Sequence, residues 1–207
     1  MGNFTYEFEN RSQHLEEYEW DYTWIEHADK VDLPRVLYIG DSISCATRNV
    51  ATEIADGALY FDGFGTSKAV DNPYFPDAIR LFAKQQGARK AIVFNNGLHG
   101  WHLDDETAYG QSYEQFLKFL LAEFPGTPVF LALTTAVRSE KRTPRIIARN
   151  QAVLALGEKY HLPVIDLYSL VDQNRSLISQ DGVHLTEDGY RHIGQEIVAQ
   201  IQKGLQK

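Results

Sequence analysis

The 207-residue chain has a single cysteine, Cys45, so it cannot form a disulfide within itself. One thiol fits a reducing compartment, and the first residues lack the basic start and apolar core of a secretory signal. The sequence also lacks an apolar run long enough to span a bilayer. We therefore expect a cytoplasmic protein that does not enter the membrane.

Positive charge is also scarce, with 20 Lys and Arg against 28 Asp and Glu, a net charge of -8. Such a balance disfavours nucleic acid or an anionic membrane as the main partner. Neither an internal repeat nor a low-complexity tract interrupts the chain. Hydrophobic residues make up 43% of the sequence, enough for one α/β domain with a full core.

The first 33 residues differ from the rest. Residues 1–30 hold eight acidic and two basic residues, a net charge of -6. They are also rich in aromatic rings, which disordered tails rarely carry, and Phe4, Tyr6 and Phe8 alternate as on one face of a strand. We expect residues 1–33 to form an arm that packs on the body, residues 34–207, or on a second subunit. A homodimer formed through the arm is a hypothesis that follows.

From residue 35 onwards, short apolar runs alternate with longer amphipathic stretches. The predicted strands are Arg35–Ile39, Ala58–Phe61, Ala91–Asn95, Pro128–Leu133 and Pro163–Asp166. The predicted helices are Cys45–Ala55, Phe75–Gln86, Asp105–Phe124, Pro144–Tyr160 and Glu187–Lys203. This alternation predicts an α/β fold, a three-layer αβα sandwich of the flavodoxin-like type with a five-stranded parallel sheet. Sites in such sheets lie beyond the carboxyl ends of the strands.

Ser42 stands at one of these strand ends, after the run Val36–Ile39 and before a predicted helix. A serine at a helix N-terminus can attack a carbonyl carbon while its own N–H binds the resulting oxyanion. The alternative is that Asp41 and Ser42 only cap the helix.

Asp181 and His184 lie three residues apart, just before the last predicted helix. At this spacing the carboxylate can reach one ring nitrogen of the histidine, which leaves the other nitrogen to take a proton from a serine. A helix-entry turn with a surface histidine would have the same pattern. The two elements together supply a nucleophile, a base and an orienting acid at one sheet edge.

With these motifs, the sequence resembles the SGNH hydrolases of the GDSL esterase/lipase superfamily. "IGDSIS" (39–44) resembles the first sequence block of that superfamily, and "DGVHLTEDGY" (181–190) resembles the fifth. "GFGTS" (63–67) lies where the second block supplies a glycine. The resemblance covers about residues 34–200 and implies Ser42, His184 and Asp181 as the catalytic residues, with no cofactor and no metal.

The third block departs from the superfamily pattern G-x-N-D, because the chain reads "FNNGLHG" (94–100). The resemblance implies an oxyanion hole made of the Ser42 amide, the Gly65 amide and a side chain from this block. That side chain is His99 if Gly97 aligns with the family glycine, or Asn96 if the strand ends earlier. One branch of the superfamily has the same N-N-G-L-H form.

Two further patterns have competing interpretations. His99, His102, Asp104 and Asp105 form H-x-x-H-x-D-D, which invites a metal site, but an oxyanion strand end and a helix cap explain them better. Trp20, Trp24 and Trp101 could stack on sugar rings or simply pack.

The resemblance implies a serine carboxylester hydrolase with a small-molecule ester substrate, and a carbohydrate O-acetylesterase is the leading hypothesis. Fold and triad do not distinguish this activity from a thioesterase or an O-acyltransferase. A catalytically silent module that binds a carbohydrate or a protein partner is the alternative from another class.

Overall fold

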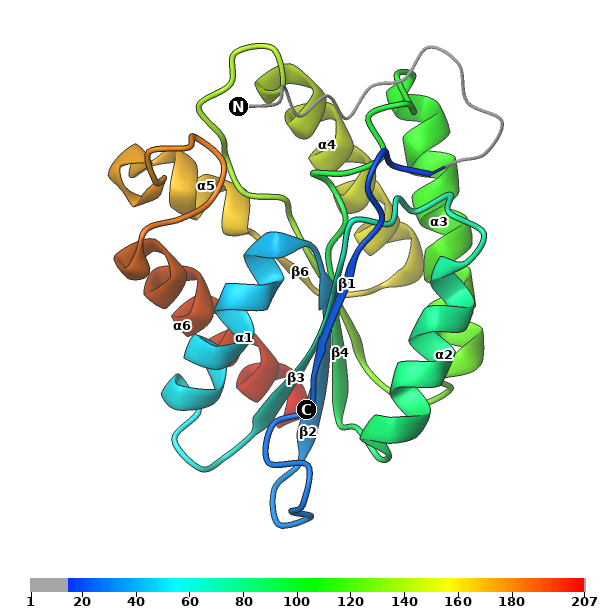
Figure 1. Cartoon of the computed structure of the whole chain (residues 1–207), viewed down its shortest axis with the longest axis vertical. Coiled ribbons are helices and arrows are strands. Elements are labelled where there is room, and N and C mark those ends of the chain that lie inside the picture. The colour runs from blue at the N-terminus through cyan, green and yellow to red at the C-terminus, as the bar shows by residue number, and fades with distance from the viewer. Residues whose placement is uncertain (1–14, 207) are drawn as a thin grey trace.

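The computed structural model describes residues 15–206, in which helices cover both faces of a six-stranded sheet (Figure 1). The strand order is β1-β3-β2-β4-β5-β6. The strands are β1 Asp21–Trp24, β2 Arg35–Gly40, β3 Tyr60–Thr66, β4 Ala91–Phe94, β5 Val129–Ala132 and β6 Val164–Ile165. The helices are α1 Ser42–Ile54, α2 Phe75–Gln86, α3 Glu106–Glu123, α4 Thr143–Tyr160, α5 Leu167–Asp172, the short 3₁₀ helix η1 Arg175–Leu177, and α6 Glu187–Leu205.

The predicted αβα sandwich is confirmed, and the five strands from β2 to β6 pair in parallel. The predicted number of strands is wrong, because the sheet has a sixth strand. β1 lies in the arm, residues 1–33, and pairs antiparallel with β3, with Tyr22 opposite Gly65. All four residues of β1 are exposed, so the strand lacks the buried apolar face by which the other strands were predicted.

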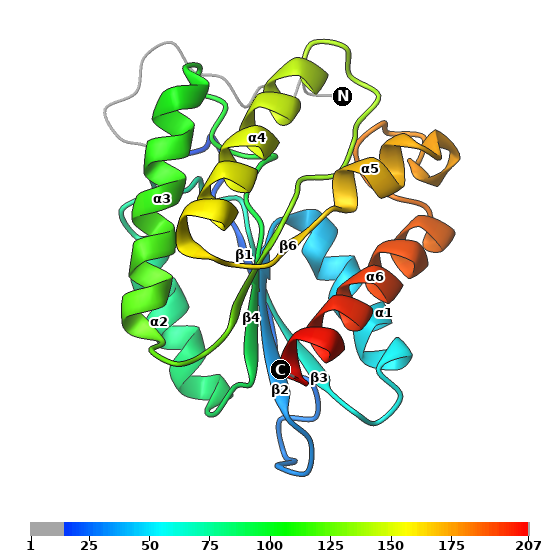
Figure 2. The same cartoon turned by 180° about the vertical axis from the view of Figure 1, so that it is seen from behind.

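Strand β2 supplies both halves of the core. Val36 and Tyr38 face the layer formed with α1, α5 and α6, whereas Leu37 and Ile39 face the layer formed with α2, α3 and α4 (Figures 1 and 2). Successive side chains of a strand point to opposite faces, so a strand buried on both sides reads as a continuous apolar run. This central position places the end of β2 in the middle of one sheet edge.

The segment that follows β1 is attached to the sheet through a buried ion pair. Arg35 contacts Asp62 at 3.0 Å and donates to the backbone carbonyls of Glu26, His27 and Lys30. Asp62 also accepts the backbone N–H of Glu26 at 2.8 Å. These contacts connect β1 and the loop after it to β2 and β3.

Several boundaries differ from the predicted ones. Helix α1 begins at Ser42 rather than Cys45, because the Asp41 side chain accepts the N–H of Ile43 and caps the helix one turn earlier. Strand β3 runs to Thr66, well beyond Phe61, because its glycine-containing end pairs with β2 on one side and with β1 on the other. The two short helices α5 and η1 were not predicted.

Phe4, Tyr6 and Phe8, predicted to lie on one strand face, fall outside the described residues. Among residues 15–206, no helix is both long enough and apolar enough to cross a membrane.

Candidate active site

Ser42 is the first residue of α1 and lies directly beyond the end of β2. Gly40 allows this tight approach, since a Cβ at that position would lie 2.7 Å from the Cβ of Ser44. The serine is half-buried, and its N–H belongs to the first turn of the helix, where the unpaired N–H groups carry partial positive charge. Ser42 is therefore presented at the sheet edge beside an anion-stabilising helix terminus.

Asp181 and His184 lie in the turn between the isolated bridge residue Ile178 and helix α6. Asp181 Oδ2 lies 2.6 Å from His184 Nδ1. The other carboxylate oxygen accepts the backbone N–H groups of Val183 and His184 and the hydroxyl of Ser179. Partial burial raises the pKa of the Asp181 carboxyl, but these hydrogen bonds outweigh it and hold the pKa well below its ordinary value. Asp181 is thus a carboxylate at neutral pH.

The second ring nitrogen of the histidine points at the serine. His184 Nε2 lies 2.8 Å from Ser42 Oγ, a distance at which a serine hydroxyl can donate to a neutral imidazole. With the ring hydrogen on Nδ1, facing Asp181, Nε2 is free to accept the serine proton. The three predicted residues are therefore connected in the order Asp181, His184, Ser42, which is the arrangement that activates a hydroxyl for attack.

Asp41 is buried next to this arrangement. Its Oδ1 caps α1, while its Oδ2 has no hydrogen-bond partner among residues 15–206. Burial raises the pKa of the Asp41 carboxyl to about 6, against the opposing effects of the Ile43 N–H and of His184. A cavity of about 10 Å³ adjoins Asp41 and is also lined by Ser44, Thr135 and Leu98. The cavity therefore lies between Leu98 of the third block and the start of α1 at Asp41 and Ser44.

The third-block residues differ in their surroundings. Asn96 is 1% exposed. Its side-chain amide donates to the backbone carbonyl of Lys68 at 2.7 Å, and its backbone carbonyl accepts the hydroxyl of Tyr109. His99 is buried as well. Burial, together with the positive charges of Arg142 and Arg149, lowers the pKa of His99 to about 4. At neutral pH the ring is therefore uncharged and keeps one N–H donor.

Gly65 lies in β3, next to Gly40 of β2 on one side and Tyr22 of β1 on the other. A Cβ at Gly65 would come within 2.1 Å of the Sγ of Cys45. This close approach to α1 places the glycine beside the helix that Ser42 begins.

The loop that carries His99, residues 97–103, is held by Arg149. This arginine of α4 is 0% exposed and donates to the backbone carbonyls of Gly97, His99 and Gly100. Its Nε also donates to Glu106 at 2.7 Å. Because a guanidinium presents its N–H groups in a rigid plane, it fixes several carbonyls of the loop at once.

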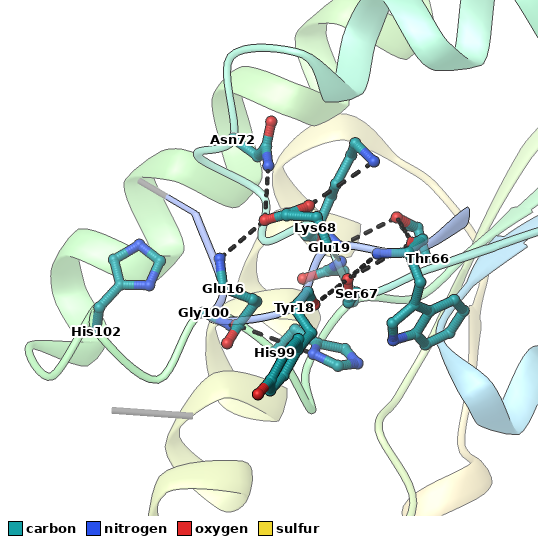
Figure 3. Close-up of polar contacts among 12 residues, drawn as sticks. Glu16, Tyr18, Glu19, Thr66, Ser67, Lys68, Asn72, His99, Gly100 and His102 are labelled. Carbon is teal, nitrogen blue, oxygen red and sulfur yellow. Dashed lines mark hydrogen bonds and ion pairs between the residues drawn. The ribbon is translucent and has the colours of Figure 1, made fainter. Parts of the chain in front are cut away.

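The N-terminal segment contacts the same loop, and Figure 3 shows Glu16 beside Gly100 and His99. Glu16 accepts the backbone N–H of Gly100 at 2.7 Å, and the Trp20 ring meets the His99 ring edge-on at a centroid distance of 6.1 Å. Trp20 is joined to Ser67 through two hydrogen bonds, from Trp20 N–H to Ser67 Oγ and from Ser67 N–H to the Trp20 carbonyl. Segment 16–20 therefore lies between the His99 loop and the loop after β3.

The residues of the alternative metal pattern have other partners. His102 Nε2 lies 2.7 Å from Asp71 Oδ2, and Asp105 caps α3 by accepting the N–H of Thr107. Within the described part of the chain, no group of three or more His, Cys, Asp or Glu side chains could hold a metal ion.

The three tryptophans are placed differently from one another. Trp101 is 2% exposed beneath the guanidinium groups of Arg142, Arg145 and Arg149, whereas Trp24 is 46% exposed. Trp101 therefore packs in the core and offers no face to a sugar.

No protein-family model and no curated protein matches the sequence. Solved structures do match. A member of the lipolytic protein G-D-S-L family from Veillonella parvula aligns at TM-score 0.67 and 17% identity over 81% of this chain and 97% of that one. The chain has the GDSL hydrolase fold. A lipase/acylhydrolase from Enterococcus faecalis shares this fold at TM-score 0.68 and 18% identity, over 83% of this chain and 96% of that one. A carbohydrate esterase family 3 protein from Talaromyces cellulolyticus aligns at TM-score 0.66 and 16% identity, over 84% and 98%.

Sequence reasoning did not single out Glu16 or Arg149, which both contact the His99 loop. Arg149 leaves a signal, because a charged residue interrupts the buried face of α4 that includes Ile146 and Val153. Glu16 leaves none, since it is one acid among many in an acidic segment.

Proposed function

We propose that the protein is a serine carboxylester hydrolase that acts through an acyl-enzyme on Ser42. The observation that carries this proposal is the pair of contacts at His184, 2.8 Å to Ser42 Oγ and 2.6 Å to Asp181 Oδ2. The GDSL hydrolase fold supports it, because the structures that share this fold are described as lipolytic proteins and esterases.

In the first half of the reaction, Ser42 Oγ attacks the ester carbonyl carbon and its proton passes to His184 Nε2. Asp181 stabilises the resulting imidazolium and keeps the ring in the tautomer that can accept the proton. The carbon–oxygen bond to the alcohol then breaks, and His184 returns the proton to the leaving oxygen. The acyl group is left on Ser42.

In the second half, water attacks the acyl carbonyl and gives a proton to His184. The bond between the acyl carbon and Ser42 Oγ breaks, and the serine takes that proton back. The products are the free acid and the regenerated serine, and none of these steps needs a cofactor.

Both tetrahedral intermediates place negative charge on the former carbonyl oxygen. We assign its donors to the backbone N–H groups of Ser42 and Gly65 and to one side chain of the third block. We favour His99 over Asn96 for that side chain, because one of the two N–H groups of the Asn96 amide donates to the Lys68 carbonyl and fixes the amide there. The neutral His99 ring can donate without bringing a competing charge.

For the substrate, we propose a small acyl ester, with an acetyl group on a carbohydrate as the leading hypothesis. The fold shared with the Talaromyces cellulolyticus carbohydrate esterase supports it. An O-acyltransferase or a thioesterase would use the same three residues, and a silent carbohydrate-binding or partner-binding module would use none of them.

Hydrolysis of p-nitrophenyl acetate and butyrate by wild type, Ser42→Ala and His184→Ala tests the proposal. We expect turnover by the wild type that both variants lose. His192→Ala is the matched control, since His192 is an exposed histidine of α6 that bonds the Asp188 carbonyl. Equal slow rates in all four proteins, with no labelling of Ser42 by a fluorophosphonate, would favour the binding module.

A second set of substrates separates the remaining activities. Release of acetate from acetylated sugars would support the carbohydrate esterase, whereas faster cleavage of acyl thioesters would favour a thioesterase. Transfer of the acetyl group to an added sugar hydroxyl in preference to water would favour an O-acyltransferase.

We also propose a cytoplasmic location and a homodimer formed through residues 1–33. The lone cysteine supports the first. The exposed edge strand β1, with Tyr22 and Trp24 each 46% exposed, supports the second. Deleting the arm and measuring the mass in solution tests the dimer. If the number of subunits calculated from that mass is the same with and without the arm, the arm does not form the dimer contact.

A further inference from the structure

We propose that Glu16 is a positioning residue for the active site, holding the loop of residues 97–103 so that His99 faces the oxyanion. Glu16 has this role only if Ser42 is the nucleophile of an esterase, as proposed above. The N-terminal segment would then be part of the working site, not an appendage to it.

The first support is the direct contact. The Glu16 side chain is 2% exposed, and its Oε1 accepts the Gly100 N–H at 2.7 Å. The same oxygen lies 3.9 Å from His99 Nδ1. Gly100 has a φ of 71°, a left-handed conformation that favours glycine, so the backbone turns sharply at the point that Glu16 holds.

The second support is that Glu16 is itself held by residues outside the His99 loop. Its backbone N–H donates to Glu19 Oε1 at 2.8 Å, and Asn72 donates to the same oxygen at 3.1 Å. Glu19 also pairs with Lys68 at 3.7 Å (Figure 3). The backbone of Glu16 is therefore tied to the loop after β3, independently of the loop that its carboxylate contacts.

The third support is the complementary contact from the other side. Arg149 donates to backbone carbonyls of the His99 loop. Glu16 accepts a backbone N–H of the same loop, that of Gly100. The ring of Trp20 lies against the edge of the His99 ring. Backbone groups of the loop are thus held in two directions, and the buried His99 ring itself packs against Trp20.

Loss of the Glu16 contact would let the loop shift without removing any reacting group. A displacement of about 1 Å at a catalytic group can cost on the order of 100-fold in rate. We therefore expect Glu16→Ala to lower kcat for p-nitrophenyl acetate by about 10-fold to 100-fold, with little change in KM, because an oxyanion contact acts mainly in the transition state.

Two further variants separate the effect of the length of the Glu16 side chain from the effect of its charge. Glu16→Gln keeps an oxygen at the right distance to accept the Gly100 N–H, so it should retain most of the wild-type kcat. Glu16→Asp keeps the charge on a side chain shorter by one methylene, so it should lose as much as Glu16→Ala. Glu17→Ala is the matched control, because Glu17 is the next residue in the chain and its side chain is exposed. The kcat of this variant should equal that of the wild type.

The deciding measurement repeats Glu16→Ala and Glu16→Asp in a His99→Ala background. If Glu16 acts through His99, the second substitution lowers kcat no further, because the positioned ring is already gone. A merely structural role would give losses that multiply, and this outcome would overturn the proposal. Glu16→Asp carries the comparison if Glu16→Ala does not fold.

The rate at which a fluorophosphonate labels Ser42 gives the same comparison without an ester substrate. A wild-type protein that labels or turns over, with an equally active Glu16→Ala variant, overturns only the role of Glu16. A wild-type protein whose Ser42 neither labels nor supports turnover overturns the esterase proposal and this one together.

Discussion

His184 Nε2 lies 2.8 Å from Ser42 Oγ although 142 positions separate the two residues in the chain. Folding brings them together because β2 ends in the middle of the sheet and α6 packs against α1 on the same face. The turn before α6 therefore opens directly above the first turn of α1. The contact follows from the topology, because Ser42 begins α1 and His184 lies in the turn just before α6.

Asp181→Asn should reduce kcat for p-nitrophenyl acetate by about 100-fold to 10,000-fold with the fold intact. An asparagine at this position cannot stabilise the imidazolium and can favour the wrong tautomer of His184. Asp188→Asn is the matched control, since Asp188 pairs with the exposed His192 at 3.4 Å, away from Ser42. Steady-state kinetics and thermal melts of both variants are the measurement. Equal activity in the two variants would show that Asp181 does not act on the histidine.

His99→Ala and Asn96→Ala should affect different quantities. Loss of an oxyanion donor lowers kcat by about 100-fold to 1,000-fold, and we expect this of His99→Ala. Asn96→Ala removes a hydrogen bond to the Lys68 carbonyl, so it should lower the free energy of unfolding by about 1–3 kcal/mol. Kinetics and urea unfolding of both variants distinguish the two effects. The reverse pattern would assign the donor to Asn96.

Asp41 should make stability depend on pH in an unusual direction. Its pKa in the folded protein is about 6, raised from 3.8 by burial, so the folded state binds the proton more tightly than the unfolded chain. Its contribution to stability is fully present below pH 3.8, declines as the pH rises, and is lost above about pH 6. Asp41→Asn should remove this dependence while an amide oxygen still caps α1.

Urea unfolding at pH 5 and pH 8 measures the effect. The change in unfolding free energy caused by Asp41→Asn should differ between the two pH values by about 1–3 kcal/mol, in favour of the variant at pH 8. Asp166→Asn is the control, because Asp166 caps α5 in the same way from an exposed position. If both substitutions have the same effect at both pH values, burial does not raise the pKa of Asp41.

Much of this fold was predictable because its strands are buried on both faces. β2, β4 and β5 read as continuous apolar runs between helical stretches, and the observed bounds of α2 equal the predicted ones. The rule that sites lie beyond strand ends also placed Ser42 and His184 at one edge. These features depend on local pattern and on general rules of topology.

The rest depends on contacts between distant residues that leave no local pattern. β1 has four exposed residues and is a strand only because it pairs with β3. Glu16 and Gly100 are 84 positions apart in the chain. Because Glu16 is one of several acidic residues in its segment, the sequence does not distinguish it from the others. The choice between His99 and Asn96 depends on the Lys68 carbonyl, which binds one N–H of the Asn96 amide and which no local sequence pattern indicates.

The closeness of Gly65 to Cys45 gives a prediction about the backbone of the site. A Cβ at position 65 would lie 2.1 Å from Cys45 Sγ, so Gly65→Ala should lower the free energy of unfolding by about 1–3 kcal/mol through overpacking. It should also lower kcat, because the strand must move away from α1 and carry the Gly65 amide with it.

Removing the sulfur should relieve the clash. The double variant Gly65→Ala, Cys45→Ala should recover most of the stability, because the next atom a Cβ would meet is the Asp41 carbonyl oxygen at 3.4 Å. Urea unfolding and kinetics of both single variants and the double variant test this, with Cys45→Ala alone as the control. If kcat recovers together with stability, the position of the Gly65 backbone sets the rate, as its assignment to the oxyanion hole requires. Full stability without recovery of kcat would mean that the site needs a glycine at position 65 for another reason, such as space for the substrate.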